Sequence, residues 1–205
     1  MKYNTILSKA YTEITIQRSR FIAYAAPVTN EDEAVRFISE INKKHPDARH
    51  IAYAYLLREP QVSRHSDAGE PQGTAGLPIL DAIKGRGLSD VAVAVVRYFG
   101  GTLLGTGGLV RAYSSSVLSA LDAAESACMT LCSVFEVTVN YADYSAVTVA
   151  LSSLGGRVIN ADFLEQVIIE LFIPTTLSEK FIEVLADATH GRATQRLIGE
   201  RYATA

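Results

Sequence analysis

The sequence predicts an α+β protein of two domains, on the basis of its length, its composition and a change of pattern along the chain. Its 205 residues suffice for two domains that each bury a hydrophobic core. Apolar residues make up 48% of the chain and charged residues 20%, which is typical of globular proteins. From about Cys128 the predicted strands and helices follow a more regular order. We therefore expect one domain over residues 1–127 and a second over residues 128–205, joined near residues 126–131.

The first domain is expected to begin with two strands and a helix. The strands cover Glu13–Gln17 and Arg20–Pro27. Asn30 and Glu33 have the spacing of a helix capping pair, and Pro46 ends the helix. The apolar residues at helical spacing between them are Ala34, Val35, Ile38 and Ile41.

The rest of the first domain is expected to hold two strands, two helices and a long loop. Arg49–Glu59 is predicted as a strand, and Ser63–Pro78 as an irregular loop, since it contains three glycines and two prolines. Residues 79–87 resemble a short helix. Asp90–Gly100 is a continuous apolar run, which predicts a strand buried on both faces. A helix follows over about Leu109–Glu125. The residues expected along one side of it are Tyr113, Val117, Leu121 and Ala124.

The second domain is predicted to have the order β-α-β-β-α-β, which is that of ferredoxin-like domains. Gly155 and Gly156 are expected to end its first helix. Thr176 and Glu179 are expected to cap its second helix, which ends at Gly191. The predicted segments are a strand over 131–141, a helix over 143–156, strands over 157–164 and 166–174, a helix from 176 and a strand over 193–201.

The charge distribution permits binding to a polyanion but does not identify one. The net charge is −3, yet residues 1–127 carry 14 Lys and Arg against 13 Asp and Glu, whereas residues 128–205 carry 5 against 9. A polyanion would therefore prefer the first domain. No apolar run approaches the roughly 20 residues of a membrane span, and the N-terminus does not have the pattern of a signal peptide. We expect a cytoplasmic protein without membrane contact.

The segment VVRYFGGTLLGTGGLVRAYSSS, residues 95–116, is the main candidate for a binding site. Its glycines can expose backbone N–H groups to an anion at a helix N-terminus, or they can permit positive φ angles and close packing, and the sequence leaves both interpretations open. The segment lacks the lysine of a P-loop and the third glycine of the dinucleotide fingerprint. The candidate anion- or nucleic-acid-binding residues are Arg97, Gly100, Gly101, Gly105, Thr106, Gly107, Gly108 and Arg111.

The preceding loop, within Ser63–Pro78, is predicted to form a second side of the site, which we call the second lip. The carboxylates of Asp67 and Glu70 can hold a metal, act together in acid–base catalysis, cap neighbouring turns or face solvent. Neither the histidines nor the serines have the spacing of a zinc site or a nucleophile motif. We therefore assign no catalytic residue and expect neither a metal nor a cofactor. The candidate residues of this loop are Ser66, Asp67, Glu70, Gly73 and Thr74.

Four blocks of the sequence carry a resemblance to a known family. They are RSRFI (18–22), HPDARHIAYAY (45–55), SDAGEPQGTAGLPIL (66–80) and VVRYFGGTLLGTGGLVRAY (95–113). In this order they resemble the YigZ/IMPACT family, in the two-domain form found in bacteria, over essentially the whole chain. The family's acidic block usually reads SDDGEP, whereas Ala68 stands here at the second aspartate. A metal site formed by that acidic pair in relatives would be weakened or lost in this chain.

The resemblance implies the folds of both domains. The first is expected to be similar to the second domain of ribosomal protein S-five, a fold shared with elongation factor G domain IV and the GHMP kinases. The second is expected to be a ferredoxin-like domain similar to elongation factor G domain V. The eukaryotic IMPACT relatives regulate translation, but their partner is not carried over to this chain.

Three functions follow as hypotheses. The preferred one is a non-enzymatic, translation-associated binding or regulatory protein, whose glycine-rich segment contacts phosphates of RNA or the ribosome. Its expected partner is RNA, the ribosome or a translation factor. The second is an enzyme that binds a nucleotide or another phosphorylated molecule, as the GHMP kinases do, with Asp67 and Glu70 as its acidic groups. The third is a protein–protein adaptor that docks through the second domain.

Overall fold

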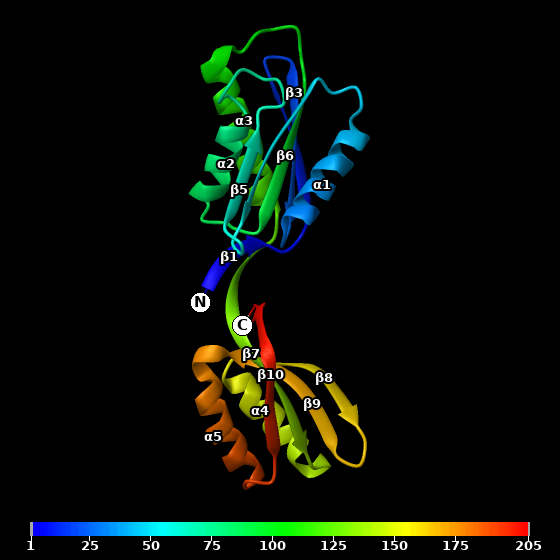
Figure 1. Cartoon of the computed structure of the whole chain (residues 1–205), viewed down its shortest axis with the longest axis vertical. Helices are drawn as coiled ribbons and strands as arrows, with labels where there is room; N and C mark the ends of the chain where they lie inside the picture. Colours follow the sequence, from blue (N-terminus) through cyan, green and yellow to red (C-terminus); the bar gives the residue numbers. More distant parts are fainter. Residues whose placement is uncertain (1, 205) are drawn as a thin grey trace. The chain divides into compact units, whose positions relative to one another are not determined.

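The computed structural model describes residues 2–204, and these fold into two units (Figure 1). Residues 3–127 form the N-terminal unit, and residues 128–204 together with Lys2 form the C-terminal unit. Each unit has its own sheet and its own hydrophobic core. Within residues 2–204, none of the helices combines the length and the hydropathy that a membrane span requires.

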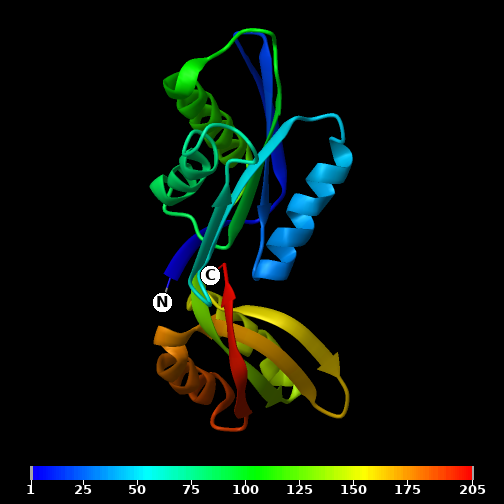
Figure 2. The ribbon, with the colours of Figure 1, turned by 45° about the horizontal axis from the view of Figure 1, so that its top comes forward.

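The N-terminal unit is an antiparallel sheet with helices on both faces. Its strands lie in the order β2-β3-β6-β4-β5. Helix α1 covers one face, and α2 and α3 cover the other (Figure 1 and Figure 2). The bounds are β1 Lys2–Ile6, β2 Ala10–Ile16, β3 Ser19–Pro27, α1 Glu31–Lys44, β4 His50–Leu57, β5 Val62–Ser66, α2 Gly76–Gly85, β6 Val91–Tyr98 and α3 Gly105–Ala123.

The strands β3 and β6 form the centre of this unit. The side chains of β6 from Val91 to Val96 are fully buried, so the predicted strand with two buried faces is confirmed. On β3, Phe21 faces the core beneath α2 and α3, whereas Ile22 and Tyr24 face the core beneath α1. This alternation gives successive residues of one strand access to opposite sides of the unit.

Helix α1 has the predicted N-terminus. The side chain of Asn30 accepts a hydrogen bond from the N–H of Glu33, and the Glu33 carboxylate in turn accepts from the N–H of Thr29. The predicted apolar face is wrong at one position, because Val35 is 54% exposed and Phe37 is buried instead. Phe37 completes the helical spacing with Ala34, Ile38 and Ile41.

Two predicted boundaries in this unit are wrong, and both bear on the site. The segment Ser63–Pro78 is not irregular throughout, because its first residues belong to β5 and its last residues to α2. The sequence also places the start of the following helix near Leu109, whereas α3 begins at Gly105. Three glycines of the candidate segment therefore lie in the first turn of a helix rather than in a loop.

The C-terminal unit has the predicted ferredoxin-like fold. Its strands lie in the order β10-β7-β9-β8, and α4 and α5 pack on one face of this sheet (Figure 1). The expected cap at Thr176 is wrong, since that residue lies in a short 3₁₀ turn before α5. The bounds are β7 Ser126–Val139, α4 Tyr141–Ser153, β8 Arg157–Phe163, β9 Val167–Pro174, η1 Thr175–Leu177, α5 Ser178–Thr189 and β10 Thr194–Ala203.

Candidate anion-binding site

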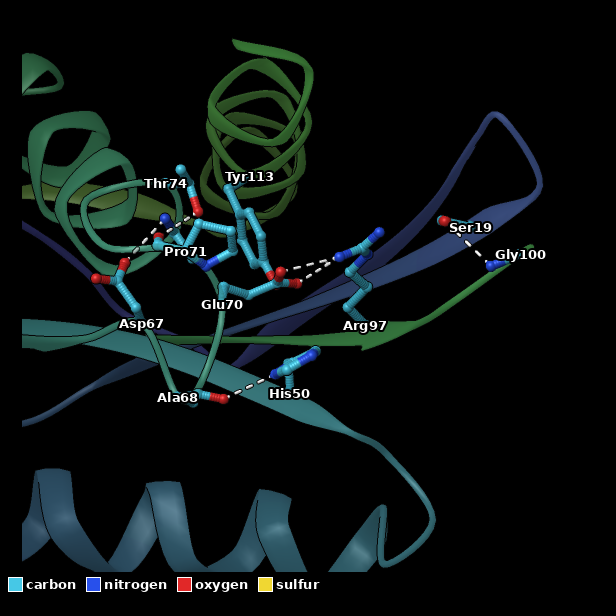
Figure 3. A network of polar contacts seen from close by, with 11 residues as sticks. Ser19, His50, Asp67, Ala68, Glu70, Pro71, Thr74, Arg97, Gly100 and Tyr113 are labelled. Carbon is cyan, nitrogen blue, oxygen red and sulfur yellow. Dashed lines mark hydrogen bonds and ion pairs between the residues drawn. The ribbon is translucent and has the colours of Figure 1, made fainter. Parts of the chain in front are cut away.

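The first two glycines of the candidate segment are explained by the fold. The N–H of Gly100 donates to Oγ of Ser19 at 3.1 Å (Figure 3). A Cβ at Gly100 would lie 2.0 Å from the carbonyl carbon of Arg18, so only glycine fits there. Gly101 has a φ of +85°, which L residues rarely adopt. The N–H of Gly100, which the sequence assigns to an anion, is thus already bound within the protein.

The other three glycines form the first turn of α3. Gly105 has a φ of +69°, which favours glycine. At Gly108 an added Cβ would come within 3.0 Å of the Leu104 Cβ. Gly107 differs from both, because its φ lies outside the left-handed region and nothing lies within 4 Å of the position of a Cβ. The fold therefore gives no reason for glycine at 107, which leaves open space beside the backbone.

The N-terminus of α3 presents N–H groups without acceptors. Leu104 occupies the N-cap position and makes no side-chain hydrogen bond, and the first turn has no acidic residue. In the described part of the chain, no carbonyl outside α3 accepts a hydrogen bond from the N–H groups of residues 105–107. A helix N-terminus of this kind carries a partial positive charge and attracts anions.

Arg97 lies beside this helix end and is held by a buried carboxylate. Its Nη1 donates to both carboxylate oxygens of Glu70, at 2.7 and 2.9 Å, and the two side chains are 7% and 2% exposed (Figure 3). The guanidinium also lies 5.6 Å from the ring centroids of both Phe21 and Phe99. Nε of Arg97 is buried and has no hydrogen-bond partner among residues 2–204. The sequence assigns Arg97 to an anion, but much of its charge is compensated by Glu70.

Tyr113 of α3 completes this buried group. Its hydroxyl donates to the Glu70 carboxylate at 2.8 Å. Burial raises the pKa of the Tyr113 hydroxyl, and the neighbouring Glu70 charge raises it further, so the hydroxyl stays a donor. Glu70 therefore connects the loop before α2 to both β6 and α3.

Asp67 also has a role within the fold. Its carboxylate accepts hydrogen bonds from the N–H groups of Gly73, Ala75 and Gly76 at 2.8–3.0 Å, which caps the N-terminus of α2. Burial acts to raise the pKa of this carboxyl, but the three backbone donors outweigh it and hold the pKa below its usual range. The alternative of a turn-capping carboxylate thus describes Asp67.

The other residues of the predicted second lip are satisfied inside the same loop. The Thr74 hydroxyl donates to the carbonyl of Pro71 at 2.6 Å, and Oγ of Ser66 accepts from the N–H of Ala68 at 3.2 Å. Of the five residues predicted for this lip, Glu70 alone lines the cavity described next, whereas Ser66, Asp67, Gly73 and Thr74 do not.

A cavity of about 400 Å³ opens onto the N-terminus of α3. Gly105 and Thr106 form its helical wall, and Arg97 with Glu70 forms another part of the wall. Its lining residues are Arg49, His50, Gly69, Glu70, Pro71, Arg97, Phe99, Leu103, Leu104, Gly105, Thr106 and Leu109. The volume falls in the range of small-molecule binding sites. Sequence reasoning did not find Arg49, His50, Phe99 or Leu103, although the last two lie inside the glycine-rich segment.

Arg111 does not share this cavity. It lines a separate cavity of about 220 Å³, together with Ile16 at the end of β2 and Gln17 of the following turn. The predicted pair of arginines on either side of one anion is therefore not formed, since Arg97 and Arg111 line different cavities.

His50 positions the loop between β5 and α2 on the cavity wall. Its Nδ1 donates to the carbonyl of Ala68 at 2.9 Å, which leaves Nε2 as the acceptor in the neutral ring (Figure 3). Ala68 itself has a φ of +48°, a conformation that Asn, Asp and Gly adopt more readily. No group of three or more His, Cys, Asp or Glu side chains in residues 2–204 is arranged to hold a metal ion.

The fold and the site define a two-domain α+β protein with an uncapped helix end that opens onto a cavity in its first domain. Residues 17–121 match the Impact N-terminal domain, and residues 137–192 match a domain of unknown function, DUF1949. The first match covers half of the chain or more, and the chain belongs to the IMPACT family.

Bacterial relatives are similar over both domains. The chain is 35% identical to IMPACT family member YigZ of Escherichia coli, over 86% of this chain and 88% of that protein. It is 33% identical to IMPACT family member YvyE of Bacillus subtilis, over 93% and 88%. A solved structure described as a hypothetical protein is 32% identical, with a TM-score of 0.63 over 96% of this chain and 97% of the other.

Proposed function

We propose that this protein is a translation-associated binding protein that holds a phosphate of single-stranded RNA at the N-terminus of α3. The observation that carries this proposal is the uncapped N-terminus of α3, whose Gly105 and Thr106 line the 400 Å³ cavity. Gly107 lies in the same helical turn but outside the cavity lining, and the open space beside its backbone lets a ligand approach the helix end closely. The link to translation rests on the family resemblance.

The charges around the cavity favour a phosphate. The N–H groups of residues 105–107 supply the positive end of the helix dipole. Arg49 lines the same cavity, and Arg97 uses Nη1 alone for its bonds to Glu70. A phosphate that enters can therefore be bound by backbone donors and by guanidinium groups together.

The rim of the cavity favours a nucleic acid over an inorganic anion. Phe99 is 51% exposed and Leu103 is also exposed, and both line the cavity. An aromatic ring beside a bound phosphate is a stacking surface for an unpaired base. A free phosphate would leave both side chains unused.

The two acidic groups that an enzyme would need are already engaged. Asp67 accepts three backbone hydrogen bonds, and Glu70 is bound to Arg97 and Tyr113. Neither carboxylate is free to act as a general base in this arrangement. This favours binding over a kinase-like reaction at the cavity.

The test adds a negative charge at the helix end. In Thr106→Asp the new carboxylate stabilises the N-terminus of α3 but repels a phosphate in the cavity that Thr106 lines. We expect its affinity for a labelled 12-nucleotide single-stranded RNA to fall about tenfold, by fluorescence anisotropy, which is about 1.4 kcal/mol. Its melting temperature is expected to stay equal or rise.

The matched control is Ser63→Asp, which adds the same negative charge at an exposed position of β5 that does not line the cavity. Its RNA affinity is expected to stay near that of the wild type. Equal affinity of Thr106→Asp and Ser63→Asp would show that the N-terminus of α3 is not the phosphate site.

A further inference from the structure

The face of the N-terminal sheet that carries α1 presents a row of four rings. Tyr11 of β2 and Tyr24 of β3 are direct cross-strand neighbours, with stacked rings 5.7 Å apart. The ring of His45, just after α1, lies 5.6 Å from Tyr24 and 6.0 Å from Tyr98 of β6. We call Tyr11, Tyr24, His45 and Tyr98 the ring row.

Hydrogen bonds fix three of the four rings, Tyr24, His45 and Tyr98, before any ligand arrives. Nε2 of His45 is 2.9 Å from the Tyr24 hydroxyl, and Nδ1 is 2.9 Å from the Tyr98 hydroxyl. Burial lowers the pKa of His45, and the charges of Lys44 and Arg20 lower it further, which favours the neutral ring with one donor and one acceptor nitrogen. A preorganised set of rings loses little entropy when a ligand binds.

Two cations lie over the ring row, and one of them has an uncompensated charge. The Lys44 ammonium is 4.7 Å from the Tyr24 centroid and 5.7 Å from that of Tyr11. Across residues 2–204, no carboxylate forms an ion pair with Lys44, whereas Arg20, which lies over the Tyr98 ring, is bound to Glu13 at 2.8 Å. Lys44 is therefore free to neutralise an anionic group of a ligand.

A cavity of about 270 Å³ lies beside the outer end of the ring row. It is lined by Tyr11, Tyr24 and Lys44, and also by Lys9 and Glu40, which form an ion pair at 3.6 Å. Tyr11 is 67% exposed. An exposed phenol ring, a cavity next to it and an unpaired ammonium are the features that bind an unpaired base and its phosphate. A peptide would not need the stacked pair of rings.

The ring row and the cavity at α3 meet at the end of β6. Arg97 and Tyr98 are consecutive on this strand, and successive side chains of a strand point to opposite faces. Arg97 lies on the α3 side with Phe21, and Tyr98 packs against the core beneath α1. A flexible strand that leaves the cavity at Phe99 can therefore pass round the end of the sheet onto the ring row.

We propose that the ring row is a second contact surface for single-stranded RNA, on which bases stack while Lys44 contacts the phosphate backbone. The proposal rests on the proposed function, because the same RNA strand is held at the N-terminus of α3. It predicts that the length of bound RNA exceeds what the cavity alone can hold.

The experiment compares two substitutions in the full chain. Tyr11→Thr removes an exposed ring from an edge strand and is expected to weaken binding of a 12-nucleotide RNA about tenfold. Lys44→Gln is expected to reduce the slope of log affinity against log salt by about 0.7, as for one lost phosphate contact. Both variants should bind a trinucleotide as the wild type does, since it reaches only the cavity.

The controls are Val35→Thr, which removes an exposed apolar side chain from α1, and Lys84→Gln, which removes a charge from α2 on the other face of the sheet. Both should leave the affinity and the salt slope unchanged. If Thr106→Asp loses RNA while Tyr11→Thr and Lys44→Gln match these controls, the ring row is not a contact surface and the phosphate site stands. If Thr106→Asp binds normally while Tyr11→Thr does not, the phosphate site at α3 fails, and the ring row binds RNA on its own rather than as a second contact surface.

Discussion

Arg97 and Glu70 form a buried ion pair in which Nη1 donates to both carboxylate oxygens, at 2.7 and 2.9 Å. The pair joins β6 to the loop before α2 on the wall of the candidate site. Because Nε of Arg97 has no partner among the described residues, the positive charge of this guanidinium is compensated mainly by the Glu70 carboxylate. The ion pair is therefore expected to contribute to the stability of the N-terminal unit and to reduce the positive potential that Arg97 adds to the cavity.

Removal of the Glu70 charge is expected to destabilise the protein strongly. Glu70→Gln leaves the buried guanidinium of Arg97 uncompensated, and we expect the free energy of unfolding in urea to fall by about 3–5 kcal/mol. Tyr113→Phe removes one hydrogen bond to the carboxylate and is expected to cost less, about 1.5–3 kcal/mol. A smaller loss for Glu70→Gln than for Tyr113→Phe would contradict this description of the pair.

The capping carboxylate of Asp67 predicts a specific loss of stability in acid. The three backbone donors make the folded-state pKa lower than the unfolded value of about 3.9, so the contribution of Asp67 is full above that value and is lost as the pH falls through the folded-state pKa. Asp67→Asn lacks the charge at every pH. We expect the difference in unfolding free energy between wild type and variant to be largest near neutral pH and to shrink below about pH 4. A difference that is constant from pH 7 to pH 2.5 would exclude a charged cap.

The fold was predictable because its signals are local. The Asn30 and Glu33 pair marks the start of α1, and the unbroken apolar run of β6 shows that both of its faces are buried. The order of elements after Cys128 was sufficient for the ferredoxin-like fold. Each of these patterns depends on residues close together in the sequence.

The site was only partly predictable, because its decisive contacts join distant residues. Glu70 lies 27 positions from Arg97 and 43 from Tyr113, and no spacing rule links them. The glycines of the segment look alike in the sequence but have separate roles. The backbone of Arg18 and Ser19 leaves no room for a side chain at Gly100, whereas nothing lies near the position of a Cβ at Gly107. The sequence shows the glycines, whereas only the packing distinguishes them.

Ala68 is expected to be a suboptimal residue for its backbone conformation. Its φ of +48° disfavours alanine, while Asn and Asp adopt this region more easily. We expect Ala68→Asn to raise the free energy of unfolding by about 0.5–1 kcal/mol, measured by chemical denaturation. Ala68→Val, with a β-branched side chain, serves as the opposite control and should lower stability. If the Asn variant is less stable than the wild type, the positive φ of residue 68 does not limit the stability of this loop.

A substitution at Gly107 is expected to change the stability of the protein and its RNA affinity in opposite directions. Because an added Cβ meets nothing within 4 Å and φ is not positive, Gly107→Ala should raise the free energy of unfolding by up to about 1 kcal/mol through better helix propensity. Gly107 lies in the same turn as Gly105 and Thr106, which line the cavity, so the added methyl group narrows the approach to the helix end and RNA affinity is expected to fall. Gly101→Ala is the matched comparison, since its φ of +85° should make it less stable by roughly 1–2 kcal/mol. A Gly107→Ala protein that is more stable and binds RNA as tightly as the wild type would show that the open space at 107 is not used by a ligand.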